Sequence, residues 1–332
     1  MGKELIPNKD RILKFIQNNA ITLGMILIAL YVGIKEPNFF TWDNFKNLSV
    51  NTTTRFIIAL GVSGCLITKG TDLSAGRMVG LGACIAATLL QKAGSAGKFF
   101  PSLPDLPIIF VVIITLAICG VFGFTNGAII SFLKVPPFIA TLGMQTLIYG
   151  ICLVYTGAVP IGSLRDDYTI VAKGSFLGMP YLLIIAVVCG ILLWFLYNKT
   201  RHGKYMYAIG GNESAAEVAG VNTGKVKIKI YTLAAVLYGL SGILLAAKAG
   251  GTSVNMGLGY ELEAIAACTI GGVSTNGGVG KISGILIGVL VFELLKISLQ
   301  FLGVETSYTY IVQGLVIIIA VALDLRKYLA KK

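Results

Sequence analysis

The amino-acid sequence predicts an all-α integral membrane protein with about ten transmembrane helices, several of them short or broken by glycine. The chain has 332 residues, of which 55% are hydrophobic and only 13% charged, and its mean hydropathy is +0.82. A typical soluble chain carries roughly 25% charged residues. The apolar residues gather in runs and the cations stand at the ends of these runs, as in membrane proteins. Residues 1–332 are therefore expected to form a single transmembrane domain.

Ten apolar segments divide the chain. A helix needs about 20 residues to cross a hydrocarbon core of about 30 Å. Residues 56–68 and 78–90 span only thirteen positions each, so neither is expected to cross comfortably alone. The ten segments are 20–34, 56–68, 78–90, 107–128, 138–156, 180–198, 228–247, 261–271, 282–300 and 308–324.

The distribution of cations predicts that both termini are cytoplasmic. An even number of crossings returns the C-terminus to the side of the N-terminus, and residues 157–179 then lie outside. The first apolar run, 20–34, is followed by no small-residue cleavage site, which favours an uncleaved first span over a signal peptide. The terminal cations are Lys3, Lys9, Arg11, Lys14, Arg326, Lys327, Lys331 and Lys332.

The longest polar interruption, residues 199–229, has six Lys or Arg residues against two glutamates, which predicts a cytoplasmic loop. Within it, Asn212 is expected to cap a short helix over 213–219, and Gly220 to end that helix in the left-handed conformation. A capped helix favours docking to a partner. The alternative is a solvated loop that only follows the positive-inside bias.

Each half of the chain carries a glycine-interrupted break, at residues 69–77 and at 271–281. Irregular backbone at membrane depth is tolerated only where protein or a water-filled cavity satisfies it. Paired breaks therefore predict an internal repeat with a solute path beside it. The alternative is that the 41 glycines only let helices pack closely.

Polar residues within the apolar segments are candidates for contact with a solute, because a buried charge costs at least about 2.5–3.5 kcal/mol. Asp72 and Arg77 are close enough in sequence to pair with one another, or else Asp72 contacts the solute. Glu261 and Glu263 are expected at the outer water interface. Neutral amides and hydroxyls near Phe138 and Tyr149 suit an uncharged polyhydroxylated solute, and the candidate side chains are Asp72, Arg77, Asn126, Thr141, Gln145, Glu261, Glu263, Thr275 and Asn276.

Several kinds of chemistry are not expected. No Gly-Lys pair is followed by Ser or Thr, so the chain lacks a phosphate-binding loop and is not expected to bind ATP. His202 is the only histidine, which argues against a catalytic triad. The six cysteines lie in apolar runs without metal-ligand spacing, so neither a metal nor another cofactor is predicted. The net charge of +12 follows membrane orientation and does not indicate nucleic acid.

From about residue 20 to 328 the chain resembles the permease subunits of bacterial ABC importers for simple sugars, the ribose, galactose, xylose and arabinose group, with the galactose/methyl-galactoside branch most similar. The resemblance depends on motifs in both halves. They are Gly70-Thr71-Asp72-Leu73-Ser74-Ala75-Gly76-Arg77, Pro137-Phe138-Ile139 with Thr141-Leu142-Gly143, Ala208-Ile209-Gly210-Gly211-Asn212, and Gly271-Gly272-Val273-Ser274 with Gly277-Gly278-Val279-Gly280.

The resemblance implies a homodimeric permease in the cytoplasmic membrane. It also implies a separate cytoplasmic ATPase with two nucleotide-binding halves and an extracytoplasmic sugar-binding protein. The residues expected along the substrate path are Thr71, Asp72, Ser74, Asn126, Phe138, Thr141, Gln145, Thr275 and Asn276. Those expected to couple to the ATPase are Arg201, Gly203, Gly210, Gly211, Asn212, Glu213, Ala215, Ala216, Glu217 and Gly220.

Two other classes remain open at the level of the sequence. An ion-coupled secondary transporter also has inverted repeats and broken helices, and Asp72 and Glu261 would be its only ionisable relay. A passive channel or scaffold would need no nucleotide. Uptake driven by an ion gradient alone would identify the first, and flux without any energy source the second.

Overall fold

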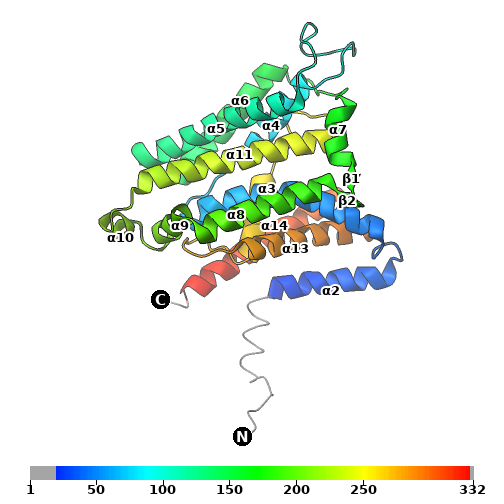
Figure 1. Cartoon of the computed structure of the whole chain (residues 1–332). Helices are drawn as coiled ribbons and strands as arrows, with labels where there is room; N and C mark the ends of the chain where they lie inside the picture. Colours follow the sequence, from blue (N-terminus) through cyan, green and yellow to red (C-terminus); the bar gives the residue numbers. More distant parts are fainter. Residues whose placement is uncertain (1–19, 330–332) are drawn as a thin grey trace.

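The computed structural model describes residues 20–329, which are mostly helical (Figure 1). Strands β1 (Ser175–Phe176) and β2 (Met179–Pro180) pair in an antiparallel hairpin. The helices are α2 (Ala20–Lys35), α3 (Trp42–Ile67), α4 (Ala75–Leu89), α5 (Ile108–Phe132), α6 (Pro137–Thr156), α7 (Asp166–Lys173), α8 (Tyr181–Lys199), α9 (Arg201–Gly211), α10 (Glu213–Val218), α11 (Thr223–Ala249), α12 (Tyr260–Ile270), α13 (Ile282–Phe301) and α14 (Thr306–Leu329).

Within residues 20–329, six helices are long and apolar enough to cross a membrane: α3, α5, α6, α8, α11 and α13. Three shorter apolar helices accompany them, at Thr22–Lys35, Ala75–Leu89 and Thr306–Ala322. These findings confirm the prediction of an all-α membrane protein. The count of ten crossings stays a prediction, since α2, α4, α12 and α14 do not all meet the length expected of a full span.

The long helices run between two ends of the molecule (Figure 1). Helices α9 and α10 lie at one end, which we call the α10 end. Helix α7 and the β1–β2 hairpin lie at the other, which we call the hairpin end. Helix α14 finishes at the α10 end (Figure 1). Six of the terminal cations used to predict the orientation lie outside the described residues. They are Lys3, Lys9, Arg11, Lys14, Lys331 and Lys332.

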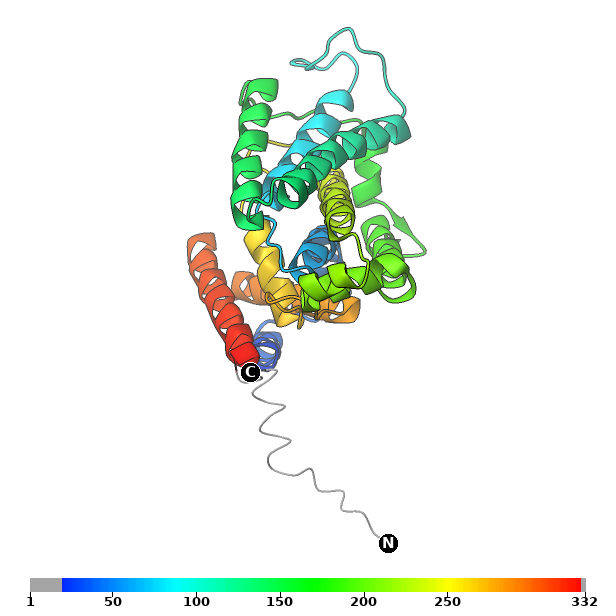
Figure 2. The same ribbon diagram turned by 90° about the vertical axis from the view of Figure 1, so that its left-hand side faces the viewer.

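Helices α3 and α11 form the centre of the bundle, with the other helices around them (Figure 2). Within their apolar windows 83% of α3 and 78% of α11 is buried, against 28% for α5 and α6 and 33% for α8. Exposed Ile, Leu, Val and Phe side chains cover the outer faces of these peripheral helices. Such a surface is suited to lipid.

Helix α3 is much longer than the short segment predicted at 56–68. Its 26 residues span about 39 Å at 1.5 Å per residue, so it is long enough to cross the bilayer alone. The prediction was wrong because Thr53 and Arg55 interrupt the apolar run. The Thr53 hydroxyl donates to Ser49 O at 3.0 Å, and Arg55 pairs with carboxylates of other helices. Helices α4 and α12 are short, as predicted, with 15 and 11 residues.

The segment 157–179, which is predicted to lie outside the membrane, contains α7 and the first strand of the hairpin. Arg165 precedes α7, pairs with Asp167 and donates to Leu106 O at 2.7 Å. Its guanidinium lowers the pKa of the Asp167 carboxyl. The buried Tyr168 hydroxyl donates to Ile243 O, which attaches α7 to α11.

Candidate functional site

The first break, residues 70–74 between α3 and α4, is held by a buried polar cluster. Asp72 is 1% exposed, and its Oδ1 accepts from Ser74 N at 3.0 Å and Ser74 Oγ at 2.6 Å. Asn126 of α5 donates through Nδ2 to Ser74 Oγ at 3.1 Å. The cluster therefore joins the break to α5, and the Asp72 carboxylate can meet a solute only if the break opens.

Thr141 joins the same break to α6. Its hydroxyl accepts from Leu73 N at 3.1 Å and lies 3.3 Å from Thr71 O and 2.9 Å from Pro137 O. Five predicted path residues, Thr71, Asp72, Ser74, Asn126 and Thr141, are thus brought together. Their polar groups mainly satisfy one another, which stabilises irregular backbone inside the bundle.

Asp72 and Arg77 do not pair, so that interpretation of the sequence was wrong. The Arg77 guanidinium lies 4.0 Å from the centroid of the Tyr149 ring, and Nη1 donates to Val254 O at 3.1 Å. Ser74 occupies Asp72 Oδ1, and the Tyr149 ring and Val254 O hold the Arg77 guanidinium away from the carboxylate. Arg77 instead faces α6 and the segment that precedes α12.

Phe138, Gln145 and Tyr149 occur at spacings of seven and four on α6 and therefore share one stripe of that helix. Phe138 is 55% exposed, whereas Gln145 and Tyr149 are half-buried. Helices α6 and α14 lie along one side of the molecule, with α4 and α12 behind them (Figure 2). We call this side the α6–α14 face. Beside it, α6 borders a hollow of about 1180 Å³ lined by Leu142, Gly143, Thr146, Gly150 and neighbouring apolar residues.

The second break, residues 271–281 between α12 and α13, is attached to the last helix. Thr275 donates to Asp324 Oδ2 of α14 through both its backbone N (3.1 Å) and its Oγ1 (2.8 Å). Asn276 N donates to Ser274 Oγ at 3.2 Å, and its buried Nδ2 has no partner among the described residues. Sequence reasoning missed Asp324, although an acid within the last apolar run was a usable signal.

The two breaks meet at the α10 end, although about 200 residues separate them. We call the contact of residues 67–70, 210–211 and 277–280 the glycine junction. Gly278 N donates to Ile67 O at 2.8 Å. A Cβ on Gly210 would lie 1.8 Å from Ile67 O and 2.4 Å from Gly278 N. Only glycine lets the end of α9 contact both breaks through the backbone.

Helix α9 was not predicted as a separate element. Thr200 caps it by accepting from Gly203 N at 3.2 Å. A Cβ on Gly203 would lie 2.1 Å from Tyr197 O, so the sharp turn from α8 into α9 requires glycine at this position. Helix α11 begins at Thr223, so the last residues of the predicted loop 199–229 belong to that helix.

The predicted capped helix is present as α10. Asn212 Oδ1 accepts from Ala215 N at 3.0 Å, and Gly220 follows the helix with φ +84°. Both capping predictions are confirmed. Ala216 is buried, whereas Ala215 is exposed and Val218 is 91% exposed. An apolar side chain so exposed at the end of the molecule is a candidate contact with a partner.

Both glutamates of α10 have partners within the chain. Glu213 pairs with Lys227 of α11 at 2.6 Å, and Glu217 Oε1 accepts from the Thr223 hydroxyl at 2.7 Å. They hold α10 against the start of α11. The cations exposed around α10 are Arg201, Lys204, Lys225 and Lys229.

Comparison with known proteins shows the family. Residues 44–321 match the family described as branched-chain amino acid transport system / permease component. The chain belongs to this permease family. It is 43% identical over 333 residues to the galactose/methyl galactoside import permease protein of Escherichia coli (strain K12), covering 98% of this chain and 99% of that protein. The protein of that name from Haemophilus influenzae is 41% identical, covering 98% of each chain.

A ribose import permease protein from Bacillus subtilis (strain 168) is also similar to this permease, with 37% identity over 92% of each chain. No solved structure matches it. Within residues 20–329, apart from side chains that the structure does not describe, the permease has no group of three or more His, Cys, Asp or Glu residues that could hold a metal ion.

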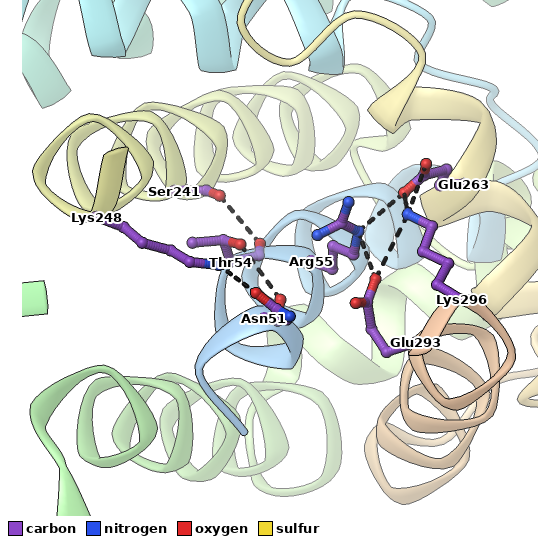
Figure 3. A network of polar contacts seen from close by, with 8 residues as sticks. All are labelled: Asn51, Thr54, Arg55, Ser241, Lys248, Glu263, Glu293 and Lys296. Carbon is purple, nitrogen blue, oxygen red and sulfur yellow. Dashed lines mark hydrogen bonds and ion pairs between the residues drawn. The ribbon is translucent and has the colours of Figure 1, made fainter. Parts of the chain in front are cut away.

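The permease also contains a buried ion network that sequence reasoning missed (Figure 3). Arg55 of α3 lies 2.9 Å from Glu263 of α12 and 2.5 Å from Glu293 of α13. Lys296 of α13 lies 2.8 Å from Glu263 and 3.6 Å from Glu293. Arg55 is near the middle of α3, roughly 18–20 Å from either end at 1.5 Å per residue. The two cations and two carboxylates of the network neutralise one another near the middle of the long helix α3.

The sequence predicted Glu261 and Glu263 at the outer water interface. This prediction was wrong, because both side chains lie within the bundle. The Glu263 side chain is 14% exposed within the network, and Glu261 is 6% exposed. Glu261 Oε2 contacts Gly76, where an added Cβ would come within 2.1 Å, and it has no hydrogen-bond partner among the described residues. Spacing along the chain carries no distance between helices, so these partners were not predictable from it.

Proposed function

We propose that this protein is the transmembrane permease subunit of an ATP-driven sugar importer, and that its sugar is galactose or a methyl galactoside. The observation that carries the proposal is the similarity to import permeases named for these sugars, at 41–43% identity over nearly the whole of both chains. The ribose import permease is less similar, at 37%. Ribose is therefore the second candidate.

The proposed path runs along the α6–α14 face, beside the two breaks, and is closed by a second copy of the permease. The apolar hollow on α6 offers that copy a surface with small residues, Gly143 and Gly150, which allow close helix packing in lipid. Phe138 and Gln145 belong to the stripe that borders the path. The buried cluster around Asp72 and Ser74 holds the first break in shape next to it.

The α10 end is proposed to be cytoplasmic, with both termini on the same side. Exposed Arg201, Lys204, Lys225 and Lys229 at that end support this orientation through the positive-inside rule. The hairpin end, with α7, is then extracytoplasmic and meets the sugar-binding protein. A bacterial cytoplasmic membrane is the expected location.

Helix α10 is proposed to dock into a cytoplasmic ATPase subunit that has two nucleotide-binding halves and performs all ATP hydrolysis. Exposed Ala215 and Val218 offer an apolar contact, and the surrounding cations favour an acidic rim on the partner. Through Gly210 and Gly211, movement of this region reaches the glycine junction. ATP then shifts the permease between inward-open and outward-open states through its differential affinity for them.

Reconstitution tests the proposal. Proteoliposomes that contain the permease, its ATPase and internal ATP are expected to accumulate labelled galactose only when the binding protein is added outside. Ribose in place of galactose distinguishes the two candidate sugars. Accumulation by the permease alone under a proton or sodium gradient would overturn the proposal in favour of a secondary transporter, and passive flux without ATP would favour a channel.

Ser74→Leu and Asn276→Leu test the position of the path. Both breaks carry polar groups that the path is expected to border, so the double variant should transport slowly while it still assembles with the ATPase. Thr125→Val on α5, whose hydroxyl donates to Val121 O of its own helix, is the control. Normal uptake by the double variant would count against a path at the breaks.

A further inference from the structure

We infer that Arg77 and Tyr149 form the point at which the permease recognises the sugar in transit, with Arg77 binding sugar hydroxyls and Tyr149 positioning the guanidinium and contacting the sugar ring. This inference rests on the proposed function. It assigns a role to two residues that lie outside the buried cluster at the first break.

The first observation is that Arg77 has unused hydrogen-bond donors. A guanidinium carries five N–H donors, and the structure gives one bond from Arg77, to Val254 O. Among the described side chains no carboxylate oxygen lies within 4.0 Å of an Arg77 nitrogen. The four remaining donors therefore have no acceptor in the described protein, although Arg77 is half-buried.

The second observation is the place of Arg77. Its partner ring, Tyr149, lies 12 residues after the first residue of α6, about 18 Å along a helix that begins at the α10 end. The pair is thus at mid-depth. Tyr149 belongs to the stripe with Gln145, and Arg77 also contacts the segment before α12, so the pair lies where α4, α6 and α12 approach one another behind the α6–α14 face (Figure 2).

The third observation is the energetic cost of this arrangement. A charge at membrane depth is unfavourable unless it faces a cavity or a partner. The ion network around Arg55 shows how this permease neutralises charges that serve packing, because each of its cations has two acidic partners. Arg77 forms no ion pair within 4.0 Å among the described side chains: Glu261, which lies against Gly76, is near enough only to interact with it electrostatically, and the guanidinium stacks on the Tyr149 ring. Stacking holds the guanidinium plane without consuming its N–H groups.

These features fit a neutral polyhydroxylated ligand. Sugar hydroxyls accept hydrogen bonds from a guanidinium fork, and the apolar face of a pyranose packs on an aromatic ring. A hydrogen bond to a charged group contributes enough to change a rate by roughly tenfold or more. A site that binds a hydroxyl also rejects analogues that lack it.

The test compares uptake in proteoliposomes that contain the ATPase, ATP and the binding protein saturated with sugar. Arg77→Gln is expected to slow galactose uptake at least about tenfold. The unmodified permease should take up galactose faster than a deoxy analogue that lacks the hydroxyl bound by Arg77. In Arg77→Gln the uptake rates of galactose and of one analogue (2-, 4- or 6-deoxy) should become nearly equal. Tyr149→Leu, which removes the ring face, should transport several-fold more slowly than Tyr149→Phe, which keeps it. Thr125→Val on α5, whose hydroxyl donates to Val121 O of its own helix, is the control.

Two outcomes would overturn the inference while the proposed function stands. One is wild-type uptake and discrimination in Arg77→Gln. The other is an equal loss for galactose and every deoxy analogue together with a lower melting temperature, which would show that Arg77 only holds α4 to the segment before α12. If the unmodified permease imports no sugar with ATP and binding protein present, the proposed function fails first and this inference fails with it.

Discussion

At the scale of single residues, Arg55 shows how a charge is kept inside this bundle. It lies between Glu263 and Glu293, and Lys296 lies between the same two acids. Each ion alone would cost at least about 2.5–3.5 kcal/mol at mid-depth. The network joins α3, α12 and α13, and a hydrogen bond from Lys248 of α11 to Asn51 extends the polar contacts to a fourth helix (Figure 3).

Removing one acid from this network should therefore destabilise the permease strongly. Glu293→Gln leaves Arg55 and Lys296 with one carboxylate, and breaking a buried pair in this way typically costs about 3–5 kcal/mol. We expect a clear drop of the melting temperature in detergent. Lys92→Ala is the control, because its pair with Asp166 is largely exposed, and exposed pairs contribute at most about 1 kcal/mol. Equal melting temperatures for the two variants would contradict the assignment.

His202 predicts a dependence of stability on pH. Burial against α3, α8 and α11 and the nearby Lys229 lower its pKa below the ordinary value of 6.5. The unfolded chain then binds the proton more readily than the native one, so stability is highest above pH 6.5 and falls as the pH drops through the lowered native pKa. His202→Gln should reduce the loss of melting temperature between about pH 7.5 and pH 5.5. An unchanged loss would assign the effect to other groups.

At the scale of elements, α10 is short and depends on its ends. Asn212→Ala removes a cap that typically contributes about 0.5–2 kcal/mol, and Gly220→Val places a β-branched residue at φ +84°. The double variant should insert normally but bind the ATPase weakly and fail to couple hydrolysis to uptake. Binding and uptake equal to those of the unmodified protein would show that α10 takes no part in coupling.

The ion pair between Glu213 and Lys227 allows a charge-swap experiment on the same element. Glu213→Lys should weaken ATPase binding because two cations then face each other across α10 and α11. Adding Lys227→Glu should restore the pair and most of the binding. If the swap does not rescue binding, Glu213 instead contacts the ATPase directly, and the loss should then depend on salt.

The elements that were predicted correctly depend on local chemistry. Asn212 and Gly220 act on backbone groups within three residues, so their roles were visible in the sequence. The length of α3, the partner of Arg77 and the contact of Thr275 with Asp324 depend on other helices. Polar residues inside apolar runs are ambiguous in a sequence because the residues that satisfy them lie far along the chain.

At the scale of the whole molecule, the orientation can be tested by cysteine labelling. The six native cysteines are buried, so they should react slowly. Leu177 at the hairpin end and Val218 at the α10 end are 88% and 91% exposed. A membrane-impermeant maleimide added to intact cells should label Leu177→Cys, and Val218→Cys only after permeabilisation. The reverse pattern would invert the proposed topology.

The glycine junction has a consequence for timing. Residues 67–70 and 277–280 belong to different halves of the chain, yet both contact Gly210 of α9 through backbone atoms. A displacement of α9 at Gly210 is therefore delivered to both breaks through backbone contacts within one step. The Lys69 side chain, which donates to Gly211 O at 3.4 Å, adds a second link to the first break. Rearrangement of the two halves should be concerted, so that a species with only one break displaced does not accumulate during the transport cycle.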